Sequence, residues 1–289
     1  MMFKKRGFLY AGLVYCSAIW GATFFVVKDT LADCHPVALV GWRFLLSAAL
    51  LLPFIKIGSL KKTFAAGLKL SAVLGALYLT QTWGLQYTAA SNSGFITGLF
   101  IVFVPLMLLA SGKHSGGWWD WAATALAVSG LWLVTGGVSG FNRGDALTVI
   151  AAVCYAGHVL LMERYIRKGA ELVPLAFHQF WMIGALCAGI ALAGGYSVAV
   201  HTSRAVWTIV FLAVFPNALA FFIQMAAQRV IDAARVSLIF ALEPVFAAVF
   251  AWTLGGEKMR PVGAAGGALI VAAIMLDGIN RARSEARVS

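Results

Sequence analysis

The sequence predicts an all-α membrane protein with ten transmembrane helices, arranged as two inverted five-helix repeats around a central cavity. Three observations lead to this fold class. Of the 289 residues, 61% are hydrophobic and only 11% are charged, against roughly 25% charged residues in a soluble domain. Ten apolar runs each have about the 20 residues that cross a bilayer. The second half of the chain also repeats features of the first half.

The composition excludes several classes of protein. With so few charges the chain cannot cover a water-facing surface, and its 20 Phe and 10 Trp exclude a disordered chain. The net charge of +11 does not indicate a nucleic-acid partner, because Lys and Arg lie in short tracts between apolar runs. The four Cys show no CxxC and no paired spacing, so we expect no zinc site and no disulfide framework. We expect no metal and no cofactor.

The ten predicted spans follow one another with short connections, so no soluble domain fits between them. They cover residues 8–28, 36–55, 68–86, 91–111, 118–136, 144–164, 173–194, 205–226, 232–254 and 261–280. An outer-membrane barrel would show period-two polarity, which stretches such as Ala122–Val134 lack. The tract Lys4-Lys5-Arg6 before the first run is similar to the start of a signal peptide. No A-x-A site closes that run, so we expect an uncleaved first span.

The placement of Lys and Arg predicts the orientation in the membrane. With ten spans and the N-terminus inside, 16 of the 22 Lys and Arg fall on the cytoplasmic side and five on the other side, while Arg43 lies within span 2. Cytoplasmic loops carry an excess of these residues. We therefore expect both termini in the cytoplasm, with the lipid bilayer around the protein.

An internal repeat divides the chain into residues 8–136 (spans 1–5) and 144–280 (spans 6–10). Pro36 and Pro174 start spans 2 and 7. Gln81 aligns with Gln224 at an offset of 143 residues, and Leu99 aligns with Leu242 at the same offset. Five spans per repeat is an odd number, so the two halves must have opposite topology. Inverted repeats of this kind build many secondary transporters, with the substrate site at the midplane between the halves.

Polar groups in hydrocarbon are costly unless they face a partner or water, so their helical phase marks the interior. In span 8, Asn217, Phe221 and Gln224 share one face. Comparable polar and aromatic faces occur in both halves. The candidate substrate-binding residues on these faces are Trp20, Thr23, Tyr78, Gln81, Asn92, Phe95, Tyr155, His158, His178, Trp181, Asn217, Phe221 and Gln224.

A second interpretation of these residues stays open. Single Gln, Asn and Thr side chains often only bond one helix to another, which contributes about 0.6–2 kcal/mol each. His158 and His178 titrate near neutrality, so each is either a hydrogen-bonding side chain or a proton relay. A whole face of amides and aromatic rings in both halves favours a cavity.

Glu243 lies in mid-span, and an ionised carboxylate at that depth is costly. It is either a proton carrier, an anchor for a substrate ammonium group, or a structural carboxyl bonded to Arg43 or to a neighbouring helix. Pro244 cannot donate to the carbonyl of Phe240 and predicts a kink there, and Pro105 predicts a kink in span 4. The repeat counterpart of Glu243 is Phe100, so the acid is not symmetric.

Arg43 is the other charge inside a span. It either extends to the outer surface or pairs with an acid such as Glu243. Spans 5 and 10 carry no polar stripe in mid-span, and span 10 contains Gly263-Ala-Ala-Gly266-Gly267. Small residues let helices approach closely, so these two spans predict packing or homodimer surfaces remote from the substrate.

The chain resembles the EamA-domain proteins of the drug/metabolite transporter superfamily over about residues 10–278. The resemblance is carried by Trp20-Gly21, Trp42-Arg43-Phe44, residues 84–95 (GLQYTAASNSGF), residues 233–239 (AARVSLI), residues 242–246 (LEPVF) and Gly255-Gly256-Glu257. It implies a bacterial inner-membrane exporter of metabolites, some members carrying amino acids. It also implies that spans 1–4 and 6–9 surround the cavity, with spans 5 and 10 at the periphery. The first half departs from the second, with His114 in place of the Glu that the second half shows as Glu257.

From these features we predict a secondary transporter, not an enzyme, that exports small amphipathic metabolites such as amino acids by alternating access. Alternatives in the same superfamily are efflux of drugs or toxic compounds and carriage of nucleotide sugars or phosphorylated metabolites, for which Arg43 is the available cation. An intramembrane enzyme would need convergent acids, bases or metal ligands, and the sequence shows no such spacing. A channel would want a ring of like charges or carbonyls, and none is visible.

Overall fold

The computed structural model describes residues 2–112, 117–136, 141–253 and 261–288, and within these ranges it contains helices and no strands. Nine helices in this part of the chain are long and apolar enough to cross a membrane. The predicted all-α membrane fold is confirmed. The count of ten spans stays a prediction. The remaining long helix covers Trp118–Thr135, and three Trp together with Asp120 in its first turn lower its mean hydropathy. His114 and Gly255-Gly256-Glu257 lie outside the described residues.

The first half comprises α1 (Met2–Thr30), α2 (Pro36–Leu51), the 3₁₀ turn η1 (Leu52–Phe54), α3 (Ile57–Gly84), α4 (Ala90–Gly98), α5 (Phe100–Ala110) and α6 (Trp118–Thr135). The second half comprises α7 (Arg143–Arg167), α8 (Leu172–Gly194), α9 (Ser203–Leu212), the π-helix η2 (Ala213–Leu219), α10 (Ala220–Ala227), α11 (Ala233–Phe240), α12 (Glu243–Thr253) and α13 (Pro261–Val288).

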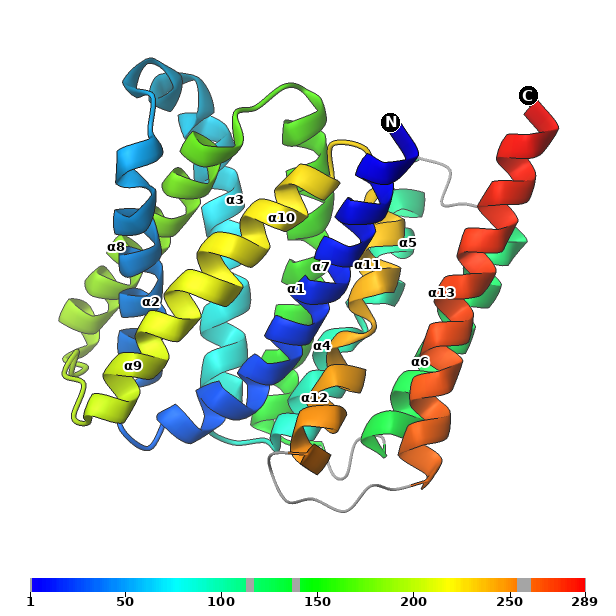
Figure 1. Ribbon diagram of the computed structural model, residues 1–289. Helices are drawn as coiled ribbons and strands as arrows, with labels where there is room; N and C mark the ends of the chain where they lie inside the picture. Colours follow the sequence, from blue (N-terminus) through cyan, green and yellow to red (C-terminus); the bar gives the residue numbers. More distant parts are fainter. Residues whose placement is uncertain (1, 113–116, 137–140, 254–260, 289) are drawn as a thin grey trace.

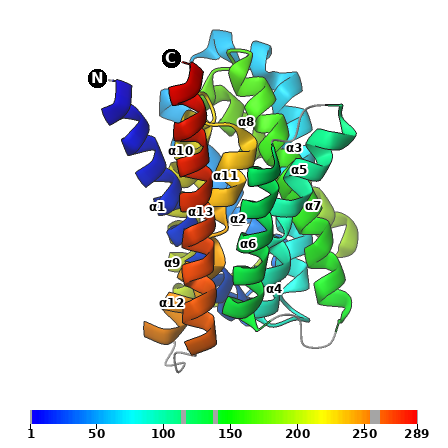
Figure 2. The same cartoon turned by 90° about the vertical axis from the view of Figure 1, so that its right-hand side faces the viewer.

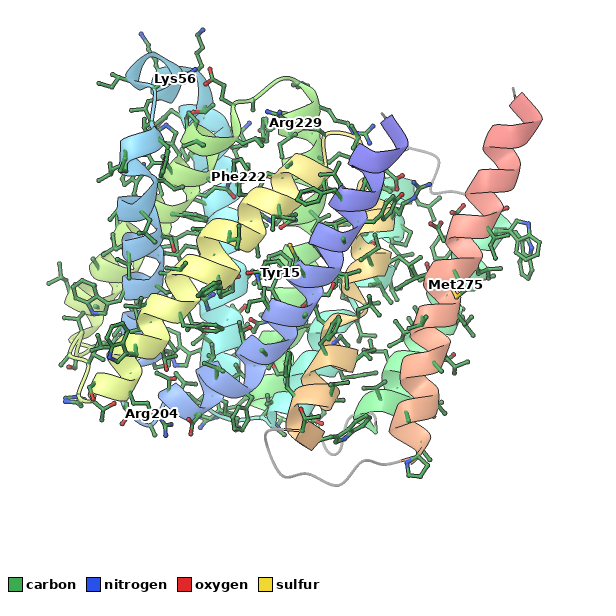
Figure 3. All side chains as sticks on the ribbon, in the orientation of Figure 1. Tyr15, Lys56, Arg204, Phe222, Arg229 and Met275 are labelled. Atoms are coloured by element: carbon green, nitrogen blue, oxygen red, sulfur yellow. The ribbon has the colours of Figure 1, made fainter. Side chains whose placement is uncertain are left out.

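The two ends of the chain lie at the same end of the molecule. Figure 1 shows α1 running down from the N-terminus and α13 running up to the C-terminus. Lys56 and Arg229 lie at that same upper end, whereas Arg204 lies at the lower end (Figure 3). We call the upper end the basic end and the lower end the opposite end.

Helices of the two halves interleave in the centre of the molecule. The helices α2 and α3 of the first half pack against α7 and α8 of the second half, and α1 packs against α10 and α12. Gly21 allows α1 to approach α12 closely, because a Cβ at Gly21 would lie 3.0 Å from the amide nitrogen of Ala247 on α12. The polar side chains of both halves are thereby brought to one interface.

The helices α6 and α13 form a pair at one side of the molecule (Figures 1 and 2), and theirs is the most extensive contact between any two helices described. Their glycines face each other. A Cβ on Gly130 would lie 2.6 Å from the carbonyl oxygen of Gly266, and a Cβ on Gly266 would lie 2.5 Å from that of Gly130. Such close approach of backbones is how membrane helices associate in the absence of a hydrophobic driving force.

Two spans are interrupted at positions related by the repeat. The span that includes α4 and α5 breaks at Leu99, and the span that includes α11 and α12 breaks at Ala241 and Leu242. Pro244 explains the second break, because proline is tolerated in the first turn of a new helix and not inside a continuous one. α5 continues as a helix through Pro105, six residues after the break at Leu99, and the predicted kink at Pro105 stays a prediction.

We predict that Gly130→Leu destabilises the protein by at least about 2 kcal/mol, because a side chain there overpacks the α6–α13 contact. Thermal unfolding of the purified full-length protein measures this loss. The control is Gly278→Leu on α13, where a Cβ meets nothing within 4 Å. Equal stability of the two variants would contradict the pairing.

Candidate functional site

A small cavity lies between the two halves, where α1 and α3 face α7, α10 and α12. Its lining residues are Trp20, Thr23, Phe24, Leu74, Leu77, Tyr78, Gln81, Tyr155, Phe221 and Glu243. The cavity measures about 30 Å³, which is room for one or two water molecules and not for an amino acid. In this conformation the space between the helices is therefore too small for such a substrate.

Trp20 is the centre of the aromatic wall. Its indole Nε1 donates a hydrogen bond to the carbonyl oxygen of Pro216, 2.9 Å away, in the π-helix η2. Its ring meets Phe221 and Phe240 edge-on at centroid distances of 5.5 and 4.9 Å. A π-helix disturbs the regular backbone bonds, so this side-chain donor stabilises a carbonyl group in the disturbed segment.

Glu243 begins α12 directly after the break, and its side chain is 5% exposed. The hydroxyl of Tyr155 donates to its Oε1 across 2.9 Å, and the Tyr155 ring stacks on Phe100 at 4.2 Å. A carboxylate at a helix N-terminus is favoured by the helix dipole. In the described residues Glu243 forms no ion pair, so one buried acid faces the cavity with a neutral partner.

The polar groups near Gln81 are contributed by the first half. The amide Nε2 of Gln81 donates to the Thr97 hydroxyl at 3.0 Å, linking α3 to α4. The Thr23 hydroxyl donates to the carbonyl oxygen of Trp20 within α1. Gln81 also lines the cavity, so this bonded amide lies at its wall.

The sequence predicts thirteen substrate-binding residues and two charges inside the membrane. Seven of these fifteen residues lie together around the cavity, and the other eight lie elsewhere. Trp20, Thr23, Tyr78, Gln81, Tyr155, Phe221 and Glu243 line it. Asn92, Phe95, His158, His178, Trp181, Asn217, Gln224 and Arg43 do not. Phe95 packs on Trp132 of the α6–α13 side instead, at 5.4 Å.

The two predicted histidines bond one helix to another. His178 Nε2 is 2.9 Å from the carbonyl oxygen of Leu60, and its Nδ1 accepts from Trp181 Nε1 at 3.1 Å. His158 Nε2 is 2.8 Å from Gln179 Oε1. The His178 contact links α3 with α8 across the two halves, and the His158 contact links α7 with α8 within the second half.

Gln224 and Asn217 are fully buried behind the cavity wall. Gln224 Nε2 donates to Gln228 Oε1 at 3.3 Å, and Gln228 in turn donates to the carbonyl oxygen of Val159 on α7. Asn217 Oδ1 accepts from Arg43 Nη2 at 2.6 Å. The face predicted for span 8 therefore does point inward, but only Phe221 of its named residues reaches the cavity.

Arg43 does not extend to the surface, as its side chain is 2% exposed. Nor does it pair with Glu243: in the described part of the chain it forms no ion pair. Its guanidinium lies over the Tyr78 ring, 4.7 Å from the centroid. Both expectations for Arg43, extension to the outer surface and pairing with an acid such as Glu243, are therefore wrong. Asn217 and the Tyr78 ring lie around the guanidinium instead.

Leu74 and Leu77 line the cavity although the sequence pattern does not single them out. They are ordinary apolar residues of a membrane helix, and only their phase relative to Tyr78 and Gln81 on α3 distinguishes them. Leu74 and Leu77 share the helical face of Tyr78 and Gln81, so a count that included apolar positions on that face would have found them.

At the opposite end, several contacts close the molecule below the cavity. Lys28 of α1 donates to the carbonyl oxygens of Leu85 and Thr88, the latter by a short contact, and the Thr88 hydroxyl donates to Asp145 of α7. Nearby, His35 stacks on Tyr196 at 4.4 Å, and burial lowers the pKa of His35. The contacts of Lys28 and Thr88 join α1, the α3–α4 connection and α7.

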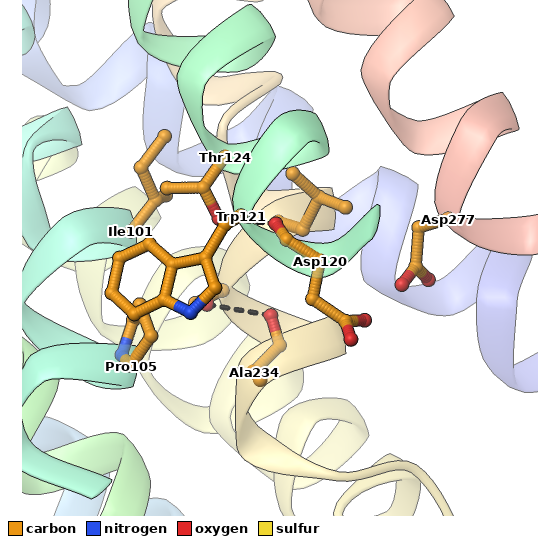
Figure 4. A pocket seen from close by; sticks show the side chains of 9 residues that line it. Ile101, Pro105, Asp120, Trp121, Thr124, Ala234 and Asp277 are labelled. Atoms are coloured by element: carbon orange, nitrogen blue, oxygen red, sulfur yellow. Dashed lines mark hydrogen bonds between the residues drawn. The ribbon is translucent and has the colours of Figure 1, made fainter. Parts of the chain in front are cut away.

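A second, smaller cavity lies near the basic end, between α5, α11 and the α6–α13 pair (Figure 4). It measures about 20 Å³, and Asp120 and Asp277 lie at its edge. Arg235 pairs with Asp277 at 3.5 Å and also donates to the Tyr10 hydroxyl at 2.7 Å. Asp277 is only 5% exposed, because α11 brings Arg235 against α13.

The model of the EamA-like transporter family matches residues 7–136 and 142–277, which is most of the chain. The chain belongs to this family. Among similar relatives, an uncharacterized transporter of Archaeoglobus fulgidus is 31% identical over 272 residues, covering 94% of this chain and 86% of that protein. The uncharacterized inner membrane transporter YedA of Escherichia coli K12 is 26% identical over 288 residues, covering 96% and 92%.

A crystal structure of another protein has the same fold. It aligns with a TM-score of 0.80 and 14% identity, covering 94% of this chain and 97% of that one. This EamA-like protein is therefore a multi-pass membrane transporter rather than an enzyme, and its predicted superfamily is confirmed. A bilayer and a small-molecule substrate follow from that membership.

We predict that Trp20→Phe lowers the thermal unfolding midpoint by about 2–4 °C, since the Pro216 carbonyl loses a hydrogen bond worth about 1 kcal/mol. Scanning calorimetry or intrinsic fluorescence of the purified protein gives the midpoint. Trp207→Phe is the matched control, because Trp207 is 72% exposed on α9. An unchanged midpoint in Trp20→Phe would mean that the indole bond does not stabilise the π-helix.

Proposed function

We propose that this transporter exports small amphipathic metabolites, amino acids first among them, across the cytoplasmic membrane by alternating access. The observation that supports it is the cavity between the two halves, where one buried acid lies among aromatic rings and the amide of Gln81. The chemistry of this lining, once the helices move apart, suits a molecule with an ammonium group and an apolar side chain.

The substrate groups have distinct counterparts in the cavity. Glu243 would bind the ammonium group, the most costly part of such a substrate to bury. Trp20, Tyr78 and Tyr155 would pack against an apolar side chain, contributing about 0.5–1.5 kcal/mol per ring pair beyond burial. Gln81 would accept a hydrogen bond from a polar backbone group.

The small size of the cavity is consistent with one state of an alternating-access cycle. At the opposite end, Lys28, Thr88 and Asp145 link α1, α3 and α7. At the basic end, Arg235 links α11 to α1 and α13. Release of one set of contacts at a time would open the cavity to one side, and the two helix breaks at Leu99 and Leu242 provide the joints.

We propose that the basic end faces the cytoplasm, with both termini there, because this places most Lys and Arg inside. We also propose ten spans, with α6 as the one in addition to the nine candidates. The two halves, 8–136 and 144–280, would then be the inverted repeats.

A homodimer would have to use the outer face of the α6–α13 pair. The glycine faces of the two helices are already occupied by each other. The outer face of α13 presents Val271, Met275 and Ile279, all exposed, and these side chains suit lipid tails as well as a second copy.

A second candidate substrate class is a cationic aromatic drug. An acid bonded by Tyr155 and surrounded by Trp20 and Tyr78 suits a cation beside rings. A phosphorylated metabolite fits this cavity less well, because the lining residues include no Lys or Arg.

The proposal is tested by comparing metabolites in the medium of cells that overproduce the protein with those of cells that lack it. Cells loaded with dipeptides should release at least one amino acid faster when the protein is overproduced. A faster release of cationic drugs without any amino acid would favour the second class. No difference for any compound would overturn the proposed export.

We predict that Glu243→Gln lowers this release at least about tenfold, because a loss of 1.4 kcal/mol in binding is tenfold and a charge pair in a buried site exceeds that. The variant retains an acceptor for Tyr155, so it should fold. Glu171→Gln, at the exposed start of α8, is the control. Unchanged release in Glu243→Gln would remove the carboxylate from the transport step.

A further inference from the structure

Arg43 is a buried cation that lacks a buried anion. It lies on α2 with its side chain 2% exposed, and it forms no ion pair with any described residue. Removing an unpaired charge from water is costly unless another group compensates it. Its neighbours are all neutral: the amide of Asn217, the ring of Phe44, and Tyr78, whose ring and hydroxyl both interact with the guanidinium.

Two hydrogen-bond donors next to this charge also lack partners. Arg43 Nε and Asn217 Nδ2 are both buried, and neither has a hydrogen-bond partner. Arg43 Nη2 and Asn217 Oδ1 are already bonded to each other at 2.6 Å. The two unpartnered donors therefore belong to one bonded pair. Buried polar groups usually have partners, so two missing ones beside a charge indicate a ligand.

The backbone near Asn217 is shaped to present this pair. Asn217 lies in the π-helix η2, and such irregular turns occur frequently at functional sites. The Ser47 hydroxyl of α2 contacts two backbone oxygens, those of Arg43 and Ala213, at 2.6 and 3.0 Å. It thereby fixes α2 against η2. One member of the pair comes from each half of the chain, as expected for a substrate site.

The pair adjoins the cavity, separated from it by two rings. The Arg43 guanidinium lies 4.7 Å from the Tyr78 centroid, and Tyr78 lines the cavity that contains Glu243. Phe221 lies one turn beyond Asn217 and lines the same cavity. A shift of Tyr78 and Phe221 would open the cavity to Arg43 and Asn217.

We propose that Arg43 and Asn217 form a second subsite, which binds the carboxylate of the transported molecule. A planar carboxylate accepts two parallel hydrogen bonds from a guanidinium, and a neighbouring amide N–H adds a third. One cation matches the single charge of a carboxylate better than the charge of a phosphate group. The inference rests on the proposed function and deepens it: once Tyr78 has moved aside, Glu243 takes the ammonium group and Arg43 the carboxylate.

The test uses benzoate as a probe, because it combines a carboxylate with a ring and does not require transport. Full-length protein in nanodiscs is unfolded by heat with benzoate, with the uncharged isostere benzamide, with phenyl phosphate, or with sodium chloride at equal ionic strength. Benzoate should raise the unfolding midpoint by at least about 2 °C at tenfold its dissociation constant. Benzamide and chloride should leave it unchanged.

Two variants locate the binding. Arg43→Gln should abolish the response to benzoate. Asn217→Asp supplies an internal carboxylate to Arg43, so its midpoint should rise without any probe and its response to benzoate should be lost. The matched control is Arg229→Gln, since Arg229 is exposed at the basic end, and its response to benzoate should equal that of the wild type.

Several results would overturn the subsite. Benzoate could leave the unfolding midpoint of the wild type unchanged, or benzamide could raise that midpoint as much as benzoate does. Phenyl phosphate could raise the midpoint more than benzoate does, or benzoate could still raise the midpoint of Asn217→Asp. Because that variant keeps the size of the side chain, the test stands even if Arg43→Gln does not fold. Failure of the export comparison together with benzoate binding at Arg43 would remove the proposed function and not the subsite.

Discussion

The structure depends on one constraint: lipid offers polar groups no hydrogen bonds, so each has to find a partner inside the protein. Trp20 therefore donates to Pro216, Tyr155 to Glu243, and Arg43 to Asn217. Each of these bonds joins the first half of the chain to the second half or one span to another. The same constraint that packs the helices also gathers the polar groups at the interface between the halves, where a transported molecule would need them.

Much of this arrangement could be predicted from the sequence. The apolar runs predict the helices, because a hydrocarbon core of fixed thickness requires their length. The helical phase of Trp20, Tyr78 and Gln81 predicts a common face, since a polar group in lipid is costly. Neither Gln81 nor Gln224 faces outward, which agrees with that reasoning.

Other features could not be predicted, because they depend on which helices meet. The sequence shows Arg43 and Glu243 as the two charges in mid-membrane, and mutual pairing is a natural expectation, but α2 faces η2 and not α12. The break at Leu99 has no proline to announce it. The π-helix around Asn217 arises where Trp20 and Ser47 of other helices bond to its carbonyl groups, and no local pattern predicts those partners.

The central claim is that the polar faces of the helices enclose a space that water reaches during transport. The most direct test replaces Cys16, Cys34, Cys154 and Cys187 and introduces either Thr23→Cys, in the cavity, or Phe25→Cys, on the exposed face of α1. A membrane-impermeant thiol reagent is then added to cells. The account predicts that Cys at position 23 reacts faster than Cys at position 25 and that a transported substrate slows the reaction. Faster labelling at position 25, with position 23 unreactive, would contradict it.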